Sequence, residues 1–302
     1  MLPGLILLTL ACNMDLWPLI FNHGDSQNRI LFTSYRSVDD QLYTMNPDGT
    51  DIQQITSGEL LHRDGRWSPD KQKIVCNVVF SAALSYSSMA VLDAFGNHLQ
   101  NLVDGSQMAW HPSGNEIVFI RSLGREGESV FKSLYSIDIL TTKVTRLIPD
   151  SLENLSAPCY TTDGNEIYFG SNRHDPSRKY YLDLYKMSTD GSNITRVTTT
   201  VDGSSYSPSV SPSGGKVAYI TRYGENSGYS LNILDIETNN IHQVASAPDS
   251  TIYNFPRWSP DEKHLVFGAV GIGLNHGYTI CRINTDGSGL VTLQDMSYLP
   301  DW

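Results

Sequence analysis

Short apolar segments alternate with tight polar turns along the whole chain. Segment 66–75 reads RWSPDKQKIV, and segment 257–267 reads RWSPDEKHLVF. Weaker copies are AWHPSGNEIVF at 109–119, CYTTDGNEIYF at 159–169 and SVSPSGGKVAY at 209–219. Each copy has an apolar anchor, a turn containing Pro, Asp or Gly, and an apolar triplet that begins seven residues after the anchor. This pattern predicts two β-strands joined by a turn.

A second element follows each triplet and predicts a β-hairpin. Its clearest copies are LYTMNPDG at 42–49, LYKMSTDG at 184–191 and ICRINTDG at 280–287, each followed by a short apolar strand. Strands joined by Asp-Gly turns are typical of hairpins. One unit therefore has four strands. Successive units are 43, 50, 50 and 48 residues apart, measured between the anchors Trp67, Trp110, Tyr160, Val210 and Trp258.

Four short strands in roughly 40–50 residues are typical of a β-propeller blade. The chain ends at Trp302, a sixth anchor with no triplet after it, whereas the triplet at 30–32 has no anchor before it. We therefore predict an all-β, six-bladed propeller over residues 28–302, closed by pairing of the C-terminal strand with the N-terminal strands. Closure of this kind removes sheet edges that would otherwise promote aggregation.

The repeated motif resembles the PD40, or WD40-like, repeat of TolB-type propellers. It is best preserved at Trp67-Ser68-Pro69-Asp70 and at Trp258-Ser259-Pro260-Asp261, and it is degenerate at 160–163 and 210–213. The resemblance covers nearly all of residues 28–302. It implies the six-bladed fold and a setting in the bacterial cell envelope, but not the particular role of TolB.

The N-terminal residues differ from the repeats. An apolar run at 5–11 precedes Cys12, and it is far shorter than the roughly 20 residues that a membrane span needs. Leu8-Thr9-Leu10-Ala11-Cys12 resembles a bacterial lipobox, in which the cysteine becomes lipidated. We therefore predict a signal peptide at 1–12, lipidation at Cys12, a linker at 13–27 and a periplasmic or surface-facing protein. The alternative is an apolar N-terminal strand with an incidental cysteine.

Composition changes this picture in one respect. The chain has 32 acidic and 21 basic residues, a formal net charge of −11, and no run of basic residues. A general nucleic-acid-binding protein needs basic surface to displace counterions from phosphates. We therefore expect no nucleic-acid partner.

The lengths of the connections indicate which face carries function. In a propeller, the anchor-to-triplet turns and the outer hairpin turns share one face, here called the turn face, and they hold nearly fixed lengths. The loops after each triplet and those leading into each anchor share the opposite loop face, where lengths vary, as is usual for functional loops. Tyr and Arg are frequent there, and both are enriched at binding hot spots. The candidate binding residues are Arg173, Tyr180, Tyr181, Arg222, Tyr223 and Tyr253.

Each candidate taken alone is more typical of an ordinary solvated loop residue. Together the arginines predict a basic patch around the channel mouth, in contrast to the acidic chain. The first functional hypothesis is a non-catalytic envelope lipoprotein that binds a protein or glycan partner through the loop face, with membrane contact only through its lipid anchor.

Sequence motifs for catalysis are missing. The chain has no G-x-S-x-G nucleophile elbow, no H-E-x-x-H and no P-loop, so we predict no catalytic residue, cofactor or metal. The alternative hypothesis is a metal-dependent hydrolase or lyase with a site at the channel mouth, where His62, His174 and His276 would meet.

Overall fold

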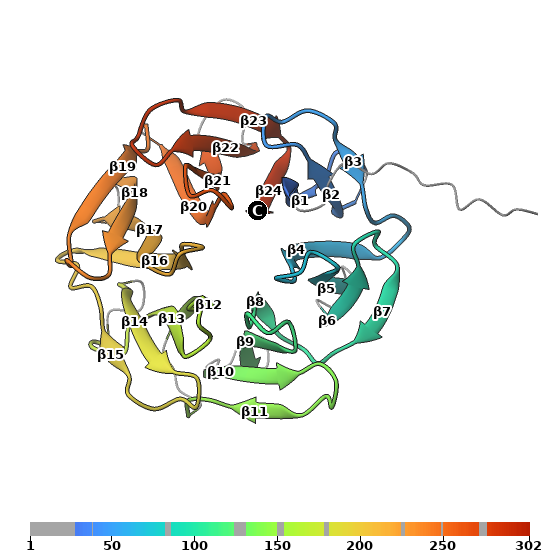
Figure 1. The fold of residues 1–302 in the computed structure, drawn as a ribbon, viewed down its shortest axis with the longest axis horizontal. Helices are drawn as coiled ribbons and strands as arrows, with labels where there is room; N and C mark the ends of the chain where they lie inside the picture. Colours follow the sequence, from blue (N-terminus) through green and yellow to red (C-terminus); the bar gives the residue numbers. More distant parts are fainter. Residues whose placement is uncertain are drawn as a thin grey trace, which may run out of the picture.

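Six four-stranded antiparallel sheets form a ring around a central axis, which confirms the predicted propeller (Figure 1). The computed structural model describes residues 28–37, 39–81, 86–123, 131–149, 154–177, 181–224, 227–248, 250–271 and 277–302, and these contain no α-helix. No helix in these ranges is long and apolar enough to cross a membrane. Cys12 and the predicted signal peptide and linker lie outside the described residues.

Each blade runs from an inner strand near the axis to an outer strand at the rim. Blade 1 contains β24 (Ser297–Asp301), β1 (Ile30–Ser34), β2 (Gln41–Met45) and β3 (Gln53–Gln54). Blade 2 contains β4 (Leu61–Trp67), β5 (Lys73–Ser81), β6 (Tyr86–Asp93) and β7 (His98–Asn101). Blade 3 contains β8 (Ser106–Trp110), β9 (Glu116–Leu123), β10 (Phe131–Asp138) and β11 (Val144–Arg146).

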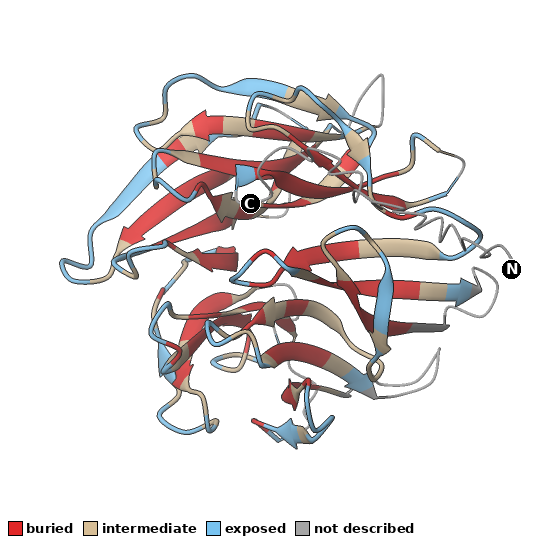
Figure 2. Ribbon diagram, turned by 45° about the vertical axis from the view of Figure 1, so that its right-hand side comes forward, coloured by how far each residue is buried: buried red, intermediate tan, exposed pale blue. Residues whose placement is uncertain are grey.

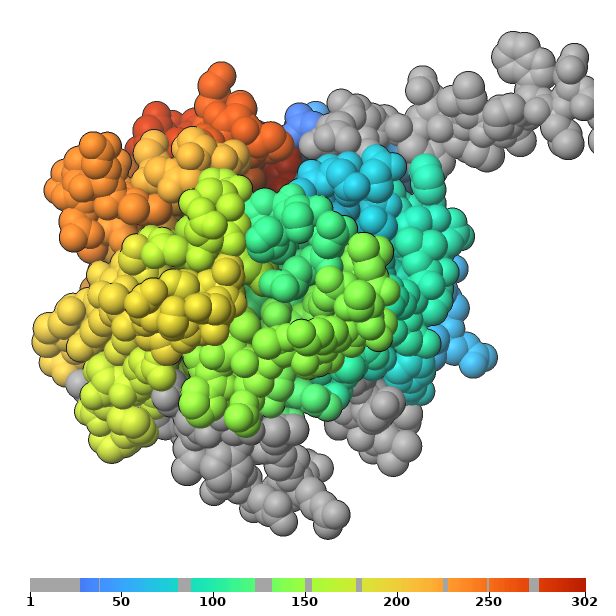
Figure 3. Space-filling view, turned by 60° about the horizontal axis from the view of Figure 1, so that its bottom comes forward, coloured from blue at the N-terminus to red at the C-terminus, as the bar shows by residue number. Residues whose placement is uncertain are grey.

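The remaining three blades repeat this order. Blade 4 contains β12 (Leu155–Tyr160), β13 (Glu166–Ser171), β14 (Asp183–Ser188) and β15 (Thr195–Arg196). Blade 5 contains β16 (Gly203–Val210), β17 (Lys216–Tyr223), β18 (Ser227–Asp235) and β19 (Ile241–Ser246). Blade 6 contains β20 (Thr251–Trp258), β21 (His264–Gly271), β22 (Tyr278–Asn284) and β23 (Val291–Asp295). Consecutive blades lie side by side around the rim (Figure 3).

The C-terminal strand closes the ring as predicted. β24 pairs antiparallel with β1, with Asp301 opposite Leu31 and Ser297 opposite Ser34. The Asp301 carboxylate accepts a hydrogen bond from the Trp67 backbone N–H at 2.8 Å in blade 2 and another from Arg257 Nε at 3.2 Å in blade 6. One side chain at the end of the chain therefore connects blade 1 to both neighbouring blades.

The core lies between neighbouring blades, where the sequence placed its apolar anchors and triplets (Figure 2). Ile74, Val75 and Cys76 of the second blade are fully buried, and the other triplets are at most 2% exposed. Trp110 Nε1 donates to the Arg66 carbonyl at 3.0 Å, and Trp258 Nε1 donates to the Ser209 carbonyl at 2.9 Å, so each ring reaches the inner strand of the preceding blade. Large rings at these positions bury much apolar surface and fix the spacing between sheets.

The W-S-P-D turns are structural. In blade 2, the Ser68 hydroxyl donates to the Asp70 carboxylate at 2.6 Å and accepts from the Lys73 N–H at 2.9 Å, which closes the turn. The Ala94 N–H of the outer hairpin donates to the Gln72 carbonyl of this turn at 3.0 Å. Equivalent bonds join the inner turn and the outer hairpin turn in blades 3 to 6. The two kinds of turn therefore share the turn face, as expected.

Every inner strand contains a β-bulge three residues before its anchor position. The pairing register of each inner strand shifts there, and the bulged residue has a positive φ between 37° and 54°. The six bulged residues are Asp64, Gln107, Ala157, Ser207, Phe255 and Leu299. None is glycine, although this backbone region is unfavourable for other residues and is often used at functional sites. The bulges therefore form a ring of six strained positions around the axis.

Candidate functional site

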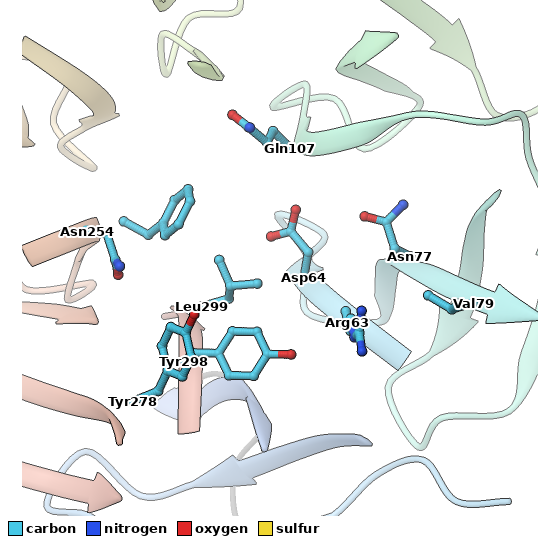
Figure 4. A pocket seen from close by; sticks show the side chains of 10 residues that line it. Arg63, Asp64, Asn77, Val79, Gln107, Asn254, Tyr278, Tyr298 and Leu299 are labelled. Carbon is cyan, nitrogen blue, oxygen red and sulfur yellow. The ribbon is translucent and has the colours of Figure 1, made fainter. Parts of the chain in front are cut away.

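A cavity of about 450 Å³ opens at the central axis between blades 1, 2, 3 and 6 (Figure 4). Val79 lies near the end of β5 and Tyr278 begins β22, so the cavity is at the loop-face end of the blades. Its volume is within the range of about 300–1,000 Å³ that is typical of small-molecule sites. The residues that line it are Arg63, Asp64, Asn77, Val79, Gln107, Asn254, Phe255, Tyr278, Tyr298 and Leu299.

The bulges place four of these side chains. Asp64, Gln107, Phe255 and Leu299 are the bulged residues of blades 2, 3, 6 and 1. A bulge bends its strand and re-aims the side chain, which here brings these four residues to one cavity. The two remaining bulged residues, Ala157 and Ser207, have small side chains and do not line it.

The cavity has an aromatic side and a polar side. Phe255, Leu299 and the two tyrosines come from blades 6 and 1, and the Tyr278 and Tyr298 rings lie 5.0 Å apart between centroids. Asn77 and Gln107 come from blades 2 and 3 and lie across the cavity from Tyr278 in Figure 4, whereas Asn254 of blade 6 lies on the same side as Tyr278.

The charged side chains of the cavity are paired. Arg63 Nε lies 2.5 Å from Asp40 Oδ2, and Asp64 Oδ1 lies 2.5 Å from Arg66 Nη2. Burial raises the pKa of Tyr298, and the neighbouring Asp40 raises it further, so the phenol stays neutral at physiological pH. The cavity therefore has no excess positive charge from Arg63, because this arginine is paired with Asp40.

Several amide groups in the cavity have hydrogen-bonding capacity left over. Gln107 Oε1 accepts from the Ala157 N–H at 2.5 Å, and Asn77 Nδ2 donates to the Gly105 carbonyl at 2.7 Å. Each side chain keeps its other polar atom without a hydrogen bond to a described residue. Asn254 Oδ1 is buried and accepts no hydrogen bond within the described part of the chain. Buried polar atoms of this kind are uncommon in folded proteins.

A second hollow, of about 290 Å³, lies on the loop-face side between blades 4 and 5. Arg222, a predicted binding residue, lines it together with Asn154, Leu155, Leu182, Ser204, Tyr206 and Tyr229. The adjacent Tyr223 is 44% exposed at the end of β17. Both residues therefore lie at the loop-face end of β17, but only Arg222 lines the hollow.

The other predicted binding residues divide between the surface and the core. Arg173 lies with its guanidinium 5.9 Å from the centroid of the Tyr185 ring, and Tyr181 is partly exposed. Tyr180 lies outside the described residues. Tyr253 is only 2% exposed and packs edge-on against Phe267, with 4.7 Å between ring centroids. The structure therefore places Tyr253 in the core between blades 5 and 6 and not at the surface.

A buried carboxylate organises the loop side of blade 4, and the sequence analysis did not identify it. The Asp183 side chain is 1% exposed and accepts hydrogen bonds from Thr198 Oγ1 and the Thr200 N–H, both at 2.9 Å. Arg196 Nε donates to it at 2.9 Å, and His174 Nε2 lies 3.6 Å away. The sequence did contain a signal for this carboxylate. Segment 183–187 (DLYKM) resembles segment 41–45 (QLYTM), but it begins with Asp183 where the other begins with Gln41.

The histidines named for a metal site have other surroundings. His62 Nδ1 lies 3.2 Å from Gln41 Oε1 and 3.1 Å from the Leu60 carbonyl oxygen, and His174 stacks on Tyr185. His276 lies outside the described residues. Over the described ranges, no three or more His, Cys, Asp or Glu side chains are grouped as metal ligands.

Comparison with known proteins gives a family match and several similar folds. Residues 97–298 match the model of the family described as the TolB beta propeller domain with PD40 repeats. TolB from Acinetobacter baumannii is 20% identical, with a TM-score of 0.74 over 92% of this chain and 67% of that chain. An oligogalacturonate lyase from Vibrio parahaemolyticus is 16% identical, with a TM-score of 0.56 over 88% of this chain and 74% of that one.

A peptidase also contains a similar propeller fold. A puromycin-hydrolyzing peptidase from Mycobacterium tuberculosis is 12% identical, with a TM-score of 0.61 over 90% of this chain and 43% of that chain. Identities this low establish a common fold, and a common fold does not establish a common activity.

Proposed function

Because the chain belongs to the TolB beta propeller domain family, we propose that it is a non-catalytic binding protein of the bacterial cell envelope. Its loop face holds a protein or glycan partner, and lipidation of Cys12 attaches it to a membrane. The observation that carries the proposal is the lining of a loop-face hollow of about 290 Å³, which Arg222 borders together with Tyr206 and Tyr229. The turn face also has a hollow, of about 430 Å³, but its described lining contains Asp138, Asp190 and Glu116 and no arginine or tyrosine.

The two faces differ in what they offer a partner. On the turn face, exposed side chains are largely used by their own turns. Asp48, for example, accepts hydrogen bonds from the Thr50 N–H at 3.0 Å and the Thr50 hydroxyl at 2.6 Å. On the loop face, Arg222 borders a hollow together with Tyr206 and Tyr229, and the next residue of the strand, Tyr223, is 44% exposed. Arginine and tyrosine are both enriched at binding hot spots.

The test compares matched variants of the two faces. The purified chain is cross-linked to envelope extract, the captured partner is identified, and its affinity is measured with the purified partner. Replacing Arg222 and Tyr223 together by alanine is expected to weaken binding by at least ~2 kcal/mol, about 30-fold. Replacing Asp48 and Thr50 by alanine is expected to change affinity less than about twofold. The proposal is wrong if only the turn-face variant loses the partner.

The anchoring part has its own test. Cys12→Ser is expected to move the protein from the membrane fraction to the soluble fraction of fractionated cells, because thioether-linked lipid would supply the attachment. Mass spectrometry of the parent protein checks for the lipid directly. An unmodified Cys12 thiol in membrane-associated protein would exclude lipid anchoring at this residue.

A further inference from the structure

The cavity at the central axis combines one aromatic side with one polar side, and we infer that it is a binding site for a neutral saccharide. A pyranose ring presents C–H groups on its faces and hydroxyl groups around its edge. The rings of Phe255 and Tyr278 offer apolar faces for the former. The amides of Asn77 and Gln107, across the cavity, offer polar atoms for the latter (Figure 4).

The polar atoms that remain in the cavity include both a hydrogen-bond donor and an acceptor, as sugar hydroxyl groups require. Gln107 keeps its Nε2 donor, because its Oε1 is already bonded to the Ala157 N–H. Asn77 keeps its Oδ1 acceptor, because its Nδ2 is bonded to the Gly105 carbonyl. Asn254 also lines the cavity, although its Oδ1 is buried against Gly268 and is not itself available to a ligand. A hydroxyl both donates and accepts, so neighbouring hydroxyls of one sugar satisfy donors and acceptors together.

Charge favours a neutral ligand. The Arg63–Asp40 and Asp64–Arg66 pairs, each at 2.5 Å, leave no net charge on the two ionic groups that line the cavity. A charged ligand would have to compete with one of these pairs. Separating a pair that is largely buried, such as Asp64 and Arg66, is costly.

The bulges disfavour an extended peptide as the ligand. One common way in which an extended peptide binds a sheet is to add a strand to a free edge through a continuous row of backbone hydrogen bonds. The inner strands that border the cavity have their row interrupted at Asp64, Gln107, Phe255 and Leu299, each with a positive φ. The cavity therefore recognises its ligand through side chains.

This inference rests on the proposed function, because it assigns a ligand class to the loop face. Its test uses the purified full chain and three neutral trisaccharides, namely maltotriose, cellotriose and triacetylchitotriose. Calorimetry and saturation-transfer NMR are expected to detect at least one of them with a Kd near ~1 mM or below. Trigalacturonate and acetyl-trialanine amide are the charged and peptide probes, and both are expected to bind at least about tenfold more weakly.

Two variants separate recognition from folding. Asn254→Leu replaces an amide that lines the cavity with an apolar side chain and is expected to weaken the sugar about tenfold. The oxygen that it removes has no described partner, so the melting temperature is expected to stay unchanged or rise. Tyr278→Ser changes a ring that is 42% exposed and is expected to weaken the sugar similarly. Thr50→Ala, in a turn of the opposite face, is the control and is expected to leave sugar binding intact.

Three results would overturn the inference. They are no binding of any neutral trisaccharide, tighter binding of trigalacturonate or the peptide, and sugar binding that survives both Asn254→Leu and Tyr278→Ser. Each leaves the proposed function standing if Arg222 and Tyr223 still decide partner affinity. Conversely, if sugar binds at the cavity but the captured envelope partner is lost only in the Asp48 and Thr50 variant, the partner site proposed at Arg222 and Tyr223 is refuted and the inference stays intact.

Discussion

Blades 1 and 4 carry similar copies of one hairpin but fasten it with different chemistry. In blade 1, Gln41 Oε1 accepts from Thr56 Oγ1 at 2.7 Å, and Gln54 Nε2 donates to the Thr56 carbonyl at 2.8 Å. The Leu42 N–H completes the arrangement by donating to Thr56 Oγ1 at 2.9 Å. All of these groups are neutral.

In blade 4 an ion pair takes the place of the two amides. Asp183 accepts from Thr198 Oγ1 at 2.9 Å, Arg196 Nε donates to the Thr198 carbonyl at 3.0 Å, and the Leu184 N–H donates to Thr198 Oγ1 at 2.9 Å. The carboxylate also reaches His174 on the loop face. The hydrogen bonds therefore form at equivalent positions in the two blades, but the residues that make them are neutral amides in blade 1 and an ion pair in blade 4. The ionic version ties loop residues to the sheet.

The largest expected effect comes from a second difference, since blade 1 takes its inner strand from the other end of the chain. Deleting residues 299–302 removes most of β24 and the Asp301 contacts to Trp67 and Arg257. We expect a loss of more than ~4 kcal/mol and association through the exposed edge of β1. Thermal melts and light scattering check this. A truncated protein as stable and monomeric as the parent would contradict ring closure by β24.

The next effect separates the ionic from the neutral version. Arg196→Ala leaves the buried Asp183 carboxylate without its cation and is expected to cost about 3 kcal/mol. Gln54→Ala, at the equivalent position of blade 1, removes a neutral hydrogen bond and is expected to cost only about 1 kcal/mol. Urea denaturation measures both. Equal losses would mean that the ion pair has no special role.

A smaller effect is expected when blade 4 is given the residues of blade 1. Asp183→Gln with Arg196→Gln removes both charges together, so we expect a loss of about 1 kcal/mol, well below the sum of the two single changes. The His174 and Thr200 contacts to the carboxylate account for the remainder. Additive losses in the double-mutant cycle would show that the two side chains act independently.

The smallest effect concerns pH and His62 of blade 2, which contacts Gln41 of blade 1. Burial lowers the pKa of His62 from its ordinary value of 6.5, and the nearby His98 lowers it further against the opposing effect of the Leu60 carbonyl. The unfolded chain therefore binds the proton more readily, and stability is lost as the pH falls through 6.5. We expect a loss below ~1 kcal/mol between about pH 7.5 and 5.5 that is missing in His62→Gln. The free energy of unfolding is measured by urea denaturation at several pH values in this range. The same pH dependence in the parent and in His62→Gln would refute the prediction.

The sequence was sufficient to predict the fold, because each copy of the repeat tests the strand positions predicted from the others. Anchors such as Trp258 and triplets such as 265–267 recur at one spacing, and both are buried where the spacing placed them. The incomplete units at Ile30 and Trp302 gave the blade number and the closure. Turn residues such as Asp70 and Gly49 have local roles that a short segment shows by itself.

The central site was not predicted, because it depends on the bulges. Tyr253 and Trp258 are five residues apart, so regular strand alternation would put them on opposite sides of the sheet. The extra residue at Phe255 brings both into the same core cluster. The same shift carries Asp64 and Gln107 to the axis. A signal existed in the four prolines two residues before the anchor position, because proline within a strand is typical of bulges: Pro158, Pro208, Pro256 and Pro300.

The ring of bulges has a consequence for how this scaffold diversifies. A positive φ that required glycine would leave no side chain at the axis. Here the six positions hold six different amino acids, from Ala157 to Phe255, in one backbone conformation. Each blade thus contributes one exchangeable side chain, and the surrounding bonds hold the main chain in place. Recombining residues at these six positions should yield propellers with altered ligand preference and an unaltered frame.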